Sequence, residues 1–183
     1  MNSQLRQAPT LAMRYRGDVF IRDLLAALAN KRVPYCVVGG VAVNLHGIPR
    51  MTYDVDLVVP TTVAALTAVD GVLAAMGLRC RLPIKLADLA DEGLRLSYRD
   101  ERNLIAVTYT DPADPLREVD ILVSPPIAAD ALVARAIRLT LGDISVPVIA
   151  IEDLIAIKRA SGRPQDLADV EHLERIARGE LDG

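Results

Sequence analysis

The chain has 183 residues, enough for one domain with a sizeable core, and 51% of them are hydrophobic, which excludes an intrinsically disordered protein. Aromatic residues make up only 3% and tryptophan is absent, so the core must be built from aliphatic side chains. The formal net charge of −3 excludes a basic footprint for nucleic acid over the whole surface, although the arginines leave room for a local basic cleft.

The cysteines and the hydropathy of the chain narrow the class of protein further. Cys36 and Cys80 lie far apart in the sequence, and neither belongs to a CxxC or CxxH spacing. We therefore expect neither a disulfide framework nor a zinc site, and we interpret Cys36 as a small buried hydrophobic residue. The N-terminus carries no apolar signal-peptide segment, and no apolar run approaches the ~20 residues of a membrane span. These features predict a cytoplasmic protein that has no membrane partner.

The first half of the chain alternates helical and strand patterns. Residues 1–16 are polar and mixed, and we expect an N-terminal arm there. Apolar spacing and turn residues then predict a helix over 17–33, a strand over 35–38, a short helix over 41–47, a strand over 52–59 and a helix over 61–76. Either Thr61 or Thr62 suits the N-cap of the last of these helices.

The second half predicts a hairpin and a helical end. The expected elements are a helix over 86–96, strands over 103–110 and 117–123 joined by a turn at 111–115, a helix over 127–139, short β-like runs over 138–141 and 144–150, and helices over 151–160 and 164–178. This order of elements predicts an α/β or α+β protein with a small mixed β-sheet.

Two carboxylates interrupt the second predicted strand. Side chains on a strand alternate between faces, so Asp54 and Asp56 point one way while Val55 and Leu57 point the other. Like charges on one face repel, and burying them unpaired is costly. A cation is therefore expected between them, and a metal ion is the first candidate.

A third carboxylate, Asp120, lies on the predicted strand 117–123. It sits between Val119 and Ile121, which point away from it. If this strand neighbours the Asp54–Asp56 strand, three carboxylates converge, and three oxygen ligands suit Mg²⁺ together with substrate phosphates. The alternative is that each aspartate faces solvent or a salt bridge.

A glycine pair and two polar residues accompany these carboxylates. Gly39 and Gly40 stand between a strand and a helix, where a backbone can approach a phosphate, although such a pair also simply permits a tight turn. Neither the Rossmann nor the Walker pattern is present. Arg50 could hold a phosphate or carboxylate in its guanidinium fork, and Thr52 alternates onto the face of Asp54.

These motifs resemble a known signature. The stretch "VVGGVAVNLHGIPRMTYDVDLVV", with the later strand aspartate Asp120, resembles the DNA polymerase β-like nucleotidyltransferase superfamily: a glycine pair, a short helix, R-x-T-x-D-x-D and a later Asp. The stretch "IEDLIAIKRASGRPQDLADVEHL" is similar to the K-x-x-x-x-R-x-x-D-x-x-D region of its bacterial members, which include abortive-infection type toxins. The resemblance spans residues 33–173. Many members have Gly-Ser at the glycine pair, so phosphate contact here is left to backbone N–H groups.

The resemblance implies an architecture and an activity. It implies one nucleotidyltransferase domain over 17–183. The core of this domain, with a small mixed sheet flanked by helices, covers 33–125, and a helical pair forms its C-terminal part over 150–180. It also implies Mg²⁺-dependent transfer of a nucleoside monophosphate from an NTP to an acceptor. RNA such as tRNA, protein or a small molecule all remain open as acceptors. A toxin role and a small antitoxin-like partner are compatible with it.

The resemblance further implies roles for single residues. Asp54 and Asp56 would ligate two Mg²⁺ ions, and Asp120 would ligate the ion on the acceptor side and help to remove the acceptor's proton. The nucleotide site would comprise Gly39, Gly40, Arg50, Thr52 and Lys158. In it, the glycines would hold the β- and γ-phosphates and Lys158 would neutralise triphosphate charge.

Several alternative interpretations stay open. The D-x-D-x-[TV] pattern of haloacid dehalogenase-type phosphatases also fits residues 54–58, but there the apolar strand precedes the first Asp, whereas here it follows. A nucleotide-binding domain that keeps the fold without transfer is the second alternative. Lys158 could be a solvated helix lysine, and Arg163 could cap the last helix or pair with Asp166 and Asp169. His46 and His172 have no ligand-like neighbours and are expected to be structural or surface residues.

Overall fold

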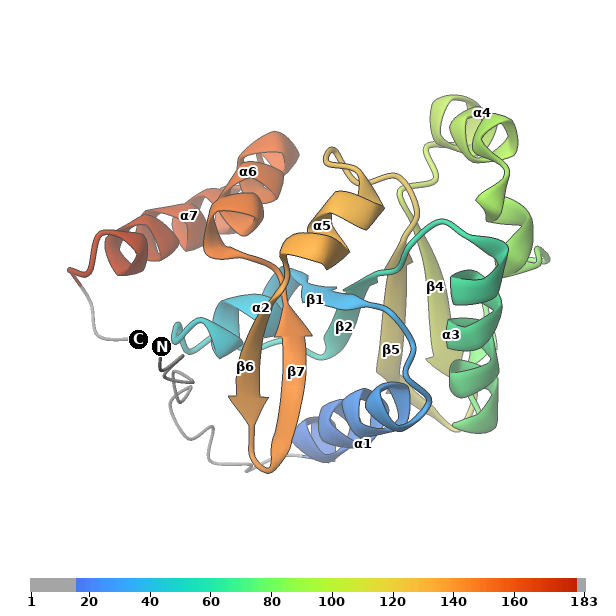
Figure 1. Cartoon of the computed structure of the whole chain (residues 1–183), viewed down its shortest axis with the longest axis horizontal. Coiled ribbons are helices and arrows are strands. Elements are labelled where there is room, and N and C mark those ends of the chain that lie inside the picture. The colour runs from blue at the N-terminus through green and yellow to red at the C-terminus, as the bar shows by residue number, and fades with distance from the viewer. Residues whose placement is uncertain (1–15, 181–183) are drawn as a thin grey trace.

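A computed structural model describes residues 16–180 of the chain (Figure 1). Residues 1–15, nearly the whole predicted N-terminal arm, lie outside the described residues, and Arg16 is the first residue of a helix. Within 16–180, no helix combines the length and the apolar character that crossing a membrane requires.

The fold is a mixed seven-stranded sheet flanked by helices, as the sequence predicts (Figure 1). The strands are β1 (Cys36–Val38), β2 (Asp54–Val58), β3 (Arg79–Cys80), β4 (Ala106–Asp111), β5 (Asp114–Leu122), β6 (Ile137–Leu141) and β7 (Ile144–Val148). The helices are α1 (Arg16–Asn30), α2 (Gly39–Leu45), α3 (Val63–Ala75), the 3₁₀ helix η1 (Leu86–Ala90), α4 (Glu92–Arg102), α5 (Ala129–Arg135), α6 (Ile151–Ser161) and α7 (Pro164–Ala177). The strand order is β3-β4-β5-β2-β1-β7-β6.

Strand β2 lies at the centre of this sheet. It pairs antiparallel with β1 on one side and parallel with β5 on the other. In that register Asp56 stands opposite Val38 of β1 and opposite Asp120 of β5. The two acidic strands of the sequence are therefore direct neighbours.

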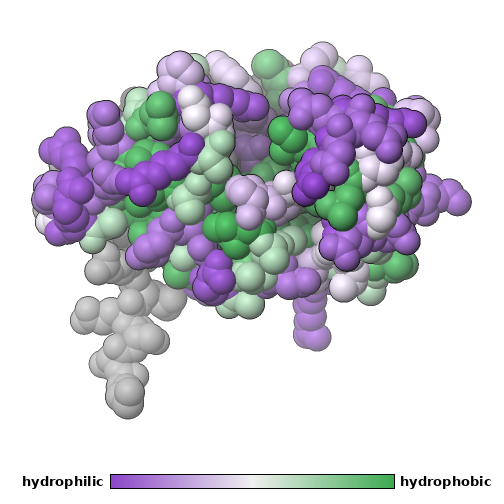
Figure 2. Space-filling view, turned by 90° about the horizontal axis from the view of Figure 1, so that it is seen from above, coloured by the Kyte–Doolittle hydropathy of each residue, from purple (hydrophilic) through white to green (hydrophobic). Residues whose placement is uncertain are grey.

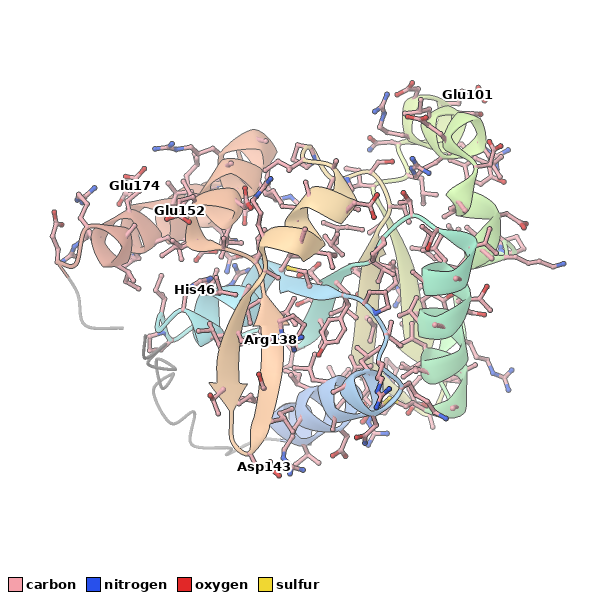
Figure 3. All side chains as sticks on the ribbon, in the orientation of Figure 1. His46, Glu101, Arg138, Asp143, Glu152 and Glu174 are labelled. Atoms are coloured by element: carbon pink, nitrogen blue, oxygen red, sulfur yellow. The ribbon has the colours of Figure 1, made fainter. Side chains whose placement is uncertain are left out.

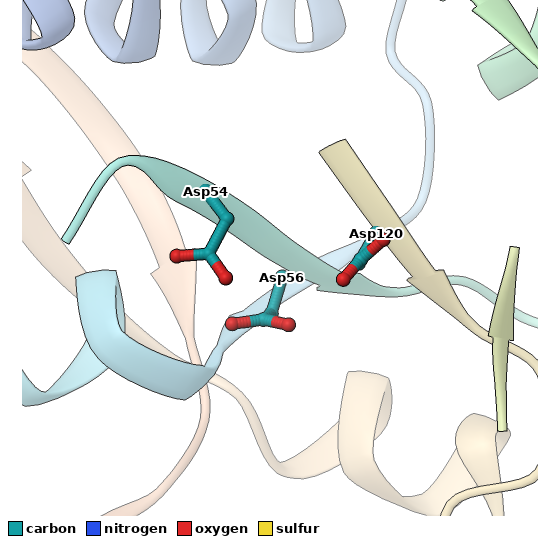
Figure 4. Close-up of side chains that lie close together, drawn as sticks. All are labelled: Asp54, Asp56 and Asp120. Atoms are coloured by element: carbon teal, nitrogen blue, oxygen red, sulfur yellow. The ribbon is translucent and has the colours of Figure 1, made fainter. Parts of the chain in front are cut away.

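Alternation along these strands separates core from site. Val55, Leu57, Val119 and Ile121 are all fully buried, whereas the aspartates between them stay partly exposed. Helix α1 lies across the sheet from the carboxylates and contacts β5, β7 and α3 (Figure 4). The aliphatic core predicted from the composition thus anchors one face of the sheet and leaves the acidic face to the site.

The predicted hairpin of strands 103–110 and 117–123 is confirmed as β4 and β5 (Figure 1). Strands β4 and β5 pair antiparallel, and their turn falls within the predicted 111–115 segment. The two-residue strand β3, which the sequence did not predict, extends the sheet beyond β4.

The predicted helix over 127–139 is too long. Helix α5 ends at Arg135, and Ile137–Leu141 forms strand β6, which pairs with β7. The alanine-rich start favours a helix, but the alternating residues after it gain a full antiparallel ladder, so tertiary pairing overrides the helical spacing. The tip of this hairpin lies beside α1, where Arg22 Nη2 is 2.7 Å from Asp143 Oδ1 (Figure 3).

The predicted helix over 86–96 is divided in two. The 3₁₀ helix η1 ends before Asp91, whose carboxylate accepts a hydrogen bond from the Leu94 N–H and caps α4. An N-cap of this kind starts a new helix because it satisfies an otherwise free N–H group. Helix α4 then runs to Arg102, and Asn103 closes it in the left-handed conformation.

The C-terminal helical pair is confirmed, with α6 packed on α7 (Figure 1). Seen from above, hydrophilic side chains gather over the α6–α7 end and over the α4 end of the molecule, with paler and apolar surface between them (Figure 2). In Figure 1 the α6–α7 pair lies at the end of the molecule where β1 and β7 lie, away from β4 and α4.

Helix α3 offers a test of its capping. Thr62, rather than Thr61, is the N-cap, and its hydroxyl accepts a hydrogen bond from the Ala65 N–H at 3.2 Å. We expect Thr62→Ala to lower the free energy of unfolding by about 1 kcal/mol, because that N–H loses its partner. Urea denaturation measures the change. Thr61→Ala is the matched control, and an equal loss in both variants would contradict the assignment of the cap.

Candidate active site

Three carboxylates converge on one face of the sheet. Asp54 and Asp56 project from β2 and Asp120 from β5, toward a common point (Figure 4). One carboxylate oxygen from each lies within 4.8 Å of the others, and all three residues are partly buried. The predicted adjacency of Asp120 is confirmed.

The glycine pair makes room for this cluster. Gly39 has φ +63°, and a Cβ there would stand 1.8 Å from Asp56 Oδ2. A Cβ at Gly40 would stand 2.7 Å from Thr52 Oγ1. Both glycines are therefore required sterically, by the carboxylate and by the hydroxyl packed against them.

Asp56 carries the electrostatic cost of the cluster. Burial, and after it the neighbouring charges of Asp54 and Asp120, raise its pKa to about 7. A hydrogen bond from the Gly40 N–H and the charge of Lys158 act in the opposite direction without cancelling the rise. The site therefore holds more negative charge than its protein partners neutralise.

Two threonines orient the carboxylates. The Thr52 hydroxyl donates to Asp54 Oδ1 at 2.7 Å, so Thr52 lies on the face of Asp54 as predicted. The Thr108 hydroxyl, on β4, donates to Asp120 Oδ1 at 2.6 Å. The sequence analysis missed Thr108 because its role depends on the register of the β4–β5 hairpin, in which it stands opposite Asp120.

An ion-pair network ties the C-terminal helices to the site. Lys158 Nζ lies 2.7 Å from Asp166 Oδ1 and 2.8 Å from Asp169 Oδ2, and the guanidinium of Arg50 pairs with the same Asp169 oxygen. The Ser161 hydroxyl also donates to Asp166. This network joins α6, α7 and the segment that leads into β2.

The structure contradicts two alternatives, a solvated Lys158 and an Arg163 that pairs with Asp166 and Asp169. Lys158 is only 4% exposed, so the solvated helix lysine is wrong, and burial of its stem beside two carboxylates explains why. The ion-pair partners of Asp166 and Asp169 are Lys158 and Arg50, whereas Arg163 stands at the N-cap position of α7. Burial alone would raise the pKa of Asp166, but hydrogen bonds from Lys158 and Ser161 hold that pKa below its usual value.

The histidines and Cys36 lie apart from the carboxylates. His46 is mostly buried and its Nε2 lies 2.8 Å from the Ile149 carbonyl oxygen, a structural contact below α6 (Figure 3). Burial lowers the pKa of His46. His172 is exposed on α7, and Cys36 is fully buried in the core with a pKa raised by burial to about 12. These expectations are confirmed.

A fourth acidic residue was missed. Glu118 is two residues before Asp120 on β5 and stands opposite Asp54 in the parallel register. Its Oε2 lies 2.8 Å from Arg81 Nη2. The signal was present, because the period-two alternation of "REVDILV" places Glu118 and Asp120 on one face.

A cavity of about 330 Å³ adjoins the cluster at Asp54, and we call it the Tyr53 pocket. Its lining comprises Arg50, Met51, Thr52, Tyr53, Asp54, Pro115, Leu116, Glu118 and Gln165. It lies between the segment that leads into β2, the β4–β5 hairpin and the start of α7.

The carboxylate cluster fits a hard divalent cation. Its donors are oxygens only, they lie within reach of a common ion, and burial together with the charges of Asp54 and Asp120 raises the pKa of Asp56, which a cation would offset. In the part of the chain from 16 to 180, it is the one cluster of at least three such ligands. Arg50, Thr52 and the glycine pair stand beside it.

Comparisons with known proteins place this geometry in context. A family described as "Nucleotidyl transferase AbiEii toxin, Type IV TA system" matches residues 23–183. A crystal structure of ANT(2″)-Ia in complex with adenylyl-2″-tobramycin is similar, with TM-score 0.58, 14% identity and coverage of 91% of each chain. A solution structure of the antibiotic-resistance factor ANT(2″)-Ia is similar with TM-score 0.54 and 13% identity, over 89% of this chain and 91% of that one. At such identity the likeness shows a shared fold. No curated protein matches the sequence.

The pKa of Asp56, raised by burial and by repulsion from Asp54 and Asp120, predicts a pH dependence of stability. The carboxyl titrates near 3.8 when unfolded and near 7 in the fold, so the folded state binds the extra proton between these values. This extra proton stabilises the fold fully below pH 3.8, and its contribution is lost as the pH rises through about 7. In metal-free buffer, the Tm of Asp56→Asn should exceed that of the wild type by several degrees at about pH 8 and by less at about pH 5.

Differential scanning calorimetry in the presence of a chelator measures this difference. Asp130→Asn, at an exposed carboxylate on α5, is the control and should show no such trend. A Tm difference that does not grow with pH would contradict the raised pKa of Asp56.

The Lys158 network predicts a large loss of stability. Lys158→Met leaves Asp166 and Asp169 without their shared ammonium group, and removing one partner of a buried pair costs about 3–5 kcal/mol. Arg159→Met is the matched control, because Arg159 is the next residue and pairs with Glu174 at the surface, where the loss is about 1 kcal/mol or less. Urea denaturation compares the two, and equal losses would show that the network does not tie the helices together.

Proposed function

Because the chain belongs to the AbiEii family of nucleotidyltransferase toxins of type IV toxin–antitoxin systems, we propose that it transfers a nucleoside monophosphate from a Mg²⁺-bound NTP to an acceptor. The observation that carries the proposal is the convergence of Asp54, Asp56 and Asp120, with their oxygens within 4.8 Å. The chain is a nucleotidyltransferase by family, and the metal, the NTP and the acceptor are the proposed part.

The carboxylates would hold two Mg²⁺ ions, which when bound neutralise phosphate charge and activate the acceptor oxygen. Asp54 and Asp56 would hold both ions, and Asp120 would serve the acceptor side and take the proton of the acceptor. In the overall reaction the acceptor oxygen forms a bond to the α-phosphorus, the bond from the α-phosphorus to the β-phosphate oxygen breaks, and pyrophosphate leaves. Thr52 and Thr108 fix the rotamers of two of these carboxylates by hydrogen bonds.

The triphosphate is proposed to lie on the β1 side of β2. Gly39 and Gly40 carry no side chains of their own, so phosphate oxygens could approach their backbone beside Asp56 and Thr52, which pack against the two glycines. Lys158 lies near enough to Asp56 to act on its pKa, and Arg50 stands next to Gly40. Both cations share Asp169 as a partner, so that carboxylate would hold them in place until phosphate arrives.

We further propose one nucleotidyltransferase domain over residues 17–183 and a small antitoxin as a partner, since the family is described by its type IV toxin–antitoxin system. The phosphatase alternative requires no pairing of the Asp54–Asp56 strand with the Asp120 strand. The direct β2–β5 pairing, with Asp56 opposite Asp120, favours transfer.

Asp120 provides the test. Asp120→Ala should bind Mg²⁺·NTP within a few-fold of the wild type through the other two carboxylates, but lose transfer by about a hundredfold or more, because proton removal and the acceptor-side ligand are gone. Isothermal titration calorimetry measures binding, and incubation of α-³²P-labelled NTPs with total RNA and with whole-cell protein measures transfer.

Asp100→Ala, at an exposed carboxylate of α4, is the matched control and should leave both measurements unchanged. Transfer at the wild-type rate by Asp120→Ala would defeat the mechanism. Nucleotide binding by the wild type without any labelled product would favour a non-catalytic binding domain.

A further inference from the structure

A second cavity lies at the end of the molecule that carries α4, and we call it the Tyr98 pocket (Figure 1). It is lined by the loop 82–85, which follows β3, and by residues of η1 and α4. Its volume of about 410 Å³ falls within the roughly 300–1,000 Å³ of small-molecule sites. None of its lining residues lines the Tyr53 pocket or belongs to the carboxylate cluster. The Tyr98 pocket is therefore a separate cavity, and the proposed reaction does not use it.

The walls of the Tyr98 pocket are fixed by contacts within the fold. Leu89 of η1 is only 1% exposed, and its carbonyl oxygen accepts a hydrogen bond from Arg95 Nη1 of α4 at 2.8 Å. The carboxylate of Asp91 caps α4 at the corner between these two helices. Further along α4, the Arg102 guanidinium lies over the Tyr98 ring, 4.8 Å from its centroid. The cavity is thus formed before a ligand enters it, which lowers the entropic cost of binding.

Apolar side chains form one part of the lining. Leu82, Leu89, Leu94 and the Tyr98 ring all line the cavity, and Leu82 is 38% exposed. An aliphatic or aromatic group of a ligand would remove part of this surface from water, which favours binding. The pocket therefore suits a ligand that carries an apolar group.

Two opposite charges form the other part of the lining. Lys85 and Asp88 are its charged residues, and both are exposed. Within residues 16–180, neither forms an ion pair with the other or with a third residue. By contrast, Arg95 and Arg102 of α4 already have their partners in the fold. Lys85 and Asp88 thus remain available to a ligand.

This pair of charges discriminates between classes of ligand. A phosphate or a simple carboxylate would be attracted by Lys85 but repelled by Asp88, and a simple amine would meet the reverse. An uncharged apolar molecule would leave both side chains without a partner. A zwitterion satisfies both of them, because its carboxylate and its ammonium group can each form a charge-assisted hydrogen bond.

We infer that the Tyr98 pocket binds a free α-amino acid with an apolar side chain, such as leucine or phenylalanine. The carboxylate of this ligand pairs with Lys85, its ammonium group pairs with Asp88, and its side chain packs between Leu89 and the Tyr98 ring. The inference does not depend on the proposed function, because the pocket shares no residue with the carboxylate cluster.

The test titrates the full chain with related probes, followed by ligand-observed NMR. L-leucine and L-phenylalanine carry both charges, whereas L-leucinamide lacks the carboxylate and isocaproate lacks the ammonium group. We expect both amino acids to bind, and we expect leucinamide and isocaproate to bind about fivefold more weakly than leucine or worse, because one charge of the pocket loses its partner.

Variants of the lining locate the binding site. Lys85→Gln, Asp88→Asn and Tyr98→Ala should each weaken leucine binding by about fivefold or more, since each removes one of the three contacts. The matched controls are Lys31→Gln and Asp130→Asn, which change exposed charges elsewhere on the surface and should leave leucine binding unchanged. Circular dichroism confirms that each variant is folded.

Four results would overturn the inference. The first is that neither amino acid binds at millimolar concentrations. The second is that isocaproate or leucinamide binds as tightly as leucine, because the pocket then does not recognise a zwitterion. The third is that Lys85→Gln and Asp88→Asn bind leucine as the wild type does, which would place the amino acid elsewhere. The fourth is that a peptide amide beginning with leucine binds more tightly than free leucine, which would assign the pocket to a protein partner.

Discussion

Mutual repulsion among Asp54, Asp56 and Asp120 is the constraint around which the rest of the site is arranged. Three carboxylates on one face of a sheet can be held together only if packing elsewhere stabilises the strands that carry them. The fully buried aliphatic face of β2 and β5 does this, because residues that alternate with the aspartates have no exposure at all. The hydrophobic effect on one face thus stabilises an electrostatically unfavourable arrangement on the other, and a cation would relieve what remains.

The C-terminal helices extend this arrangement beyond the sheet. Asp169 accepts from both Lys158 and Arg50, so α7 holds a cation of α6 and one from the segment before β2 in a single cluster. The positive charges stand near the carboxylates without neutralising them, because Asp166 and Asp169 already compensate them. Together with the burial of Asp56, this explains how Lys158 can lie close to that carboxyl while its pKa stays high.

Sequence reasoning succeeded where a short-range period decides the geometry. Alternation along a strand placed Asp54 with Asp56, and it predicted that Asp120 faces away from Val119 and Ile121. It failed where a contact depends on pairing across the fold. The boundary between α5 and β6 is set by the ladder with β7, and the burial of Lys158 is set by α7, neither of which a local pattern contains.

Glu118 and Thr108 illustrate the same limit within the site itself. The alternation of side chains along a strand could have placed Glu118 on the face of Asp120. Because Glu118 follows Arg117, however, the sequence there looks like the solvent-exposed end of a strand. Thr108 became visible only once the register of β4 against β5 was known, since it donates to Asp120 from the opposite strand. The carboxylates and Thr52 could be found from sequence by alternation along a single strand, whereas Thr108, which orients Asp120 from a neighbouring strand, could not.

The glycine pair shows why a motif and its physical cause need to be separated. The resemblance assigned Gly39 and Gly40 to phosphate binding and noted the missing serine at the second position. In the structure the side-chain space at both glycines is already filled, by Asp56 at Gly39 and by Thr52 at Gly40. A Cβ at position 40 would stand 2.7 Å from the Thr52 hydroxyl, so a serine there would displace the threonine that holds Asp54. The chain therefore has a hydroxyl beside Gly40, but that hydroxyl belongs to Thr52 in the segment before β2, where it also orients Asp54.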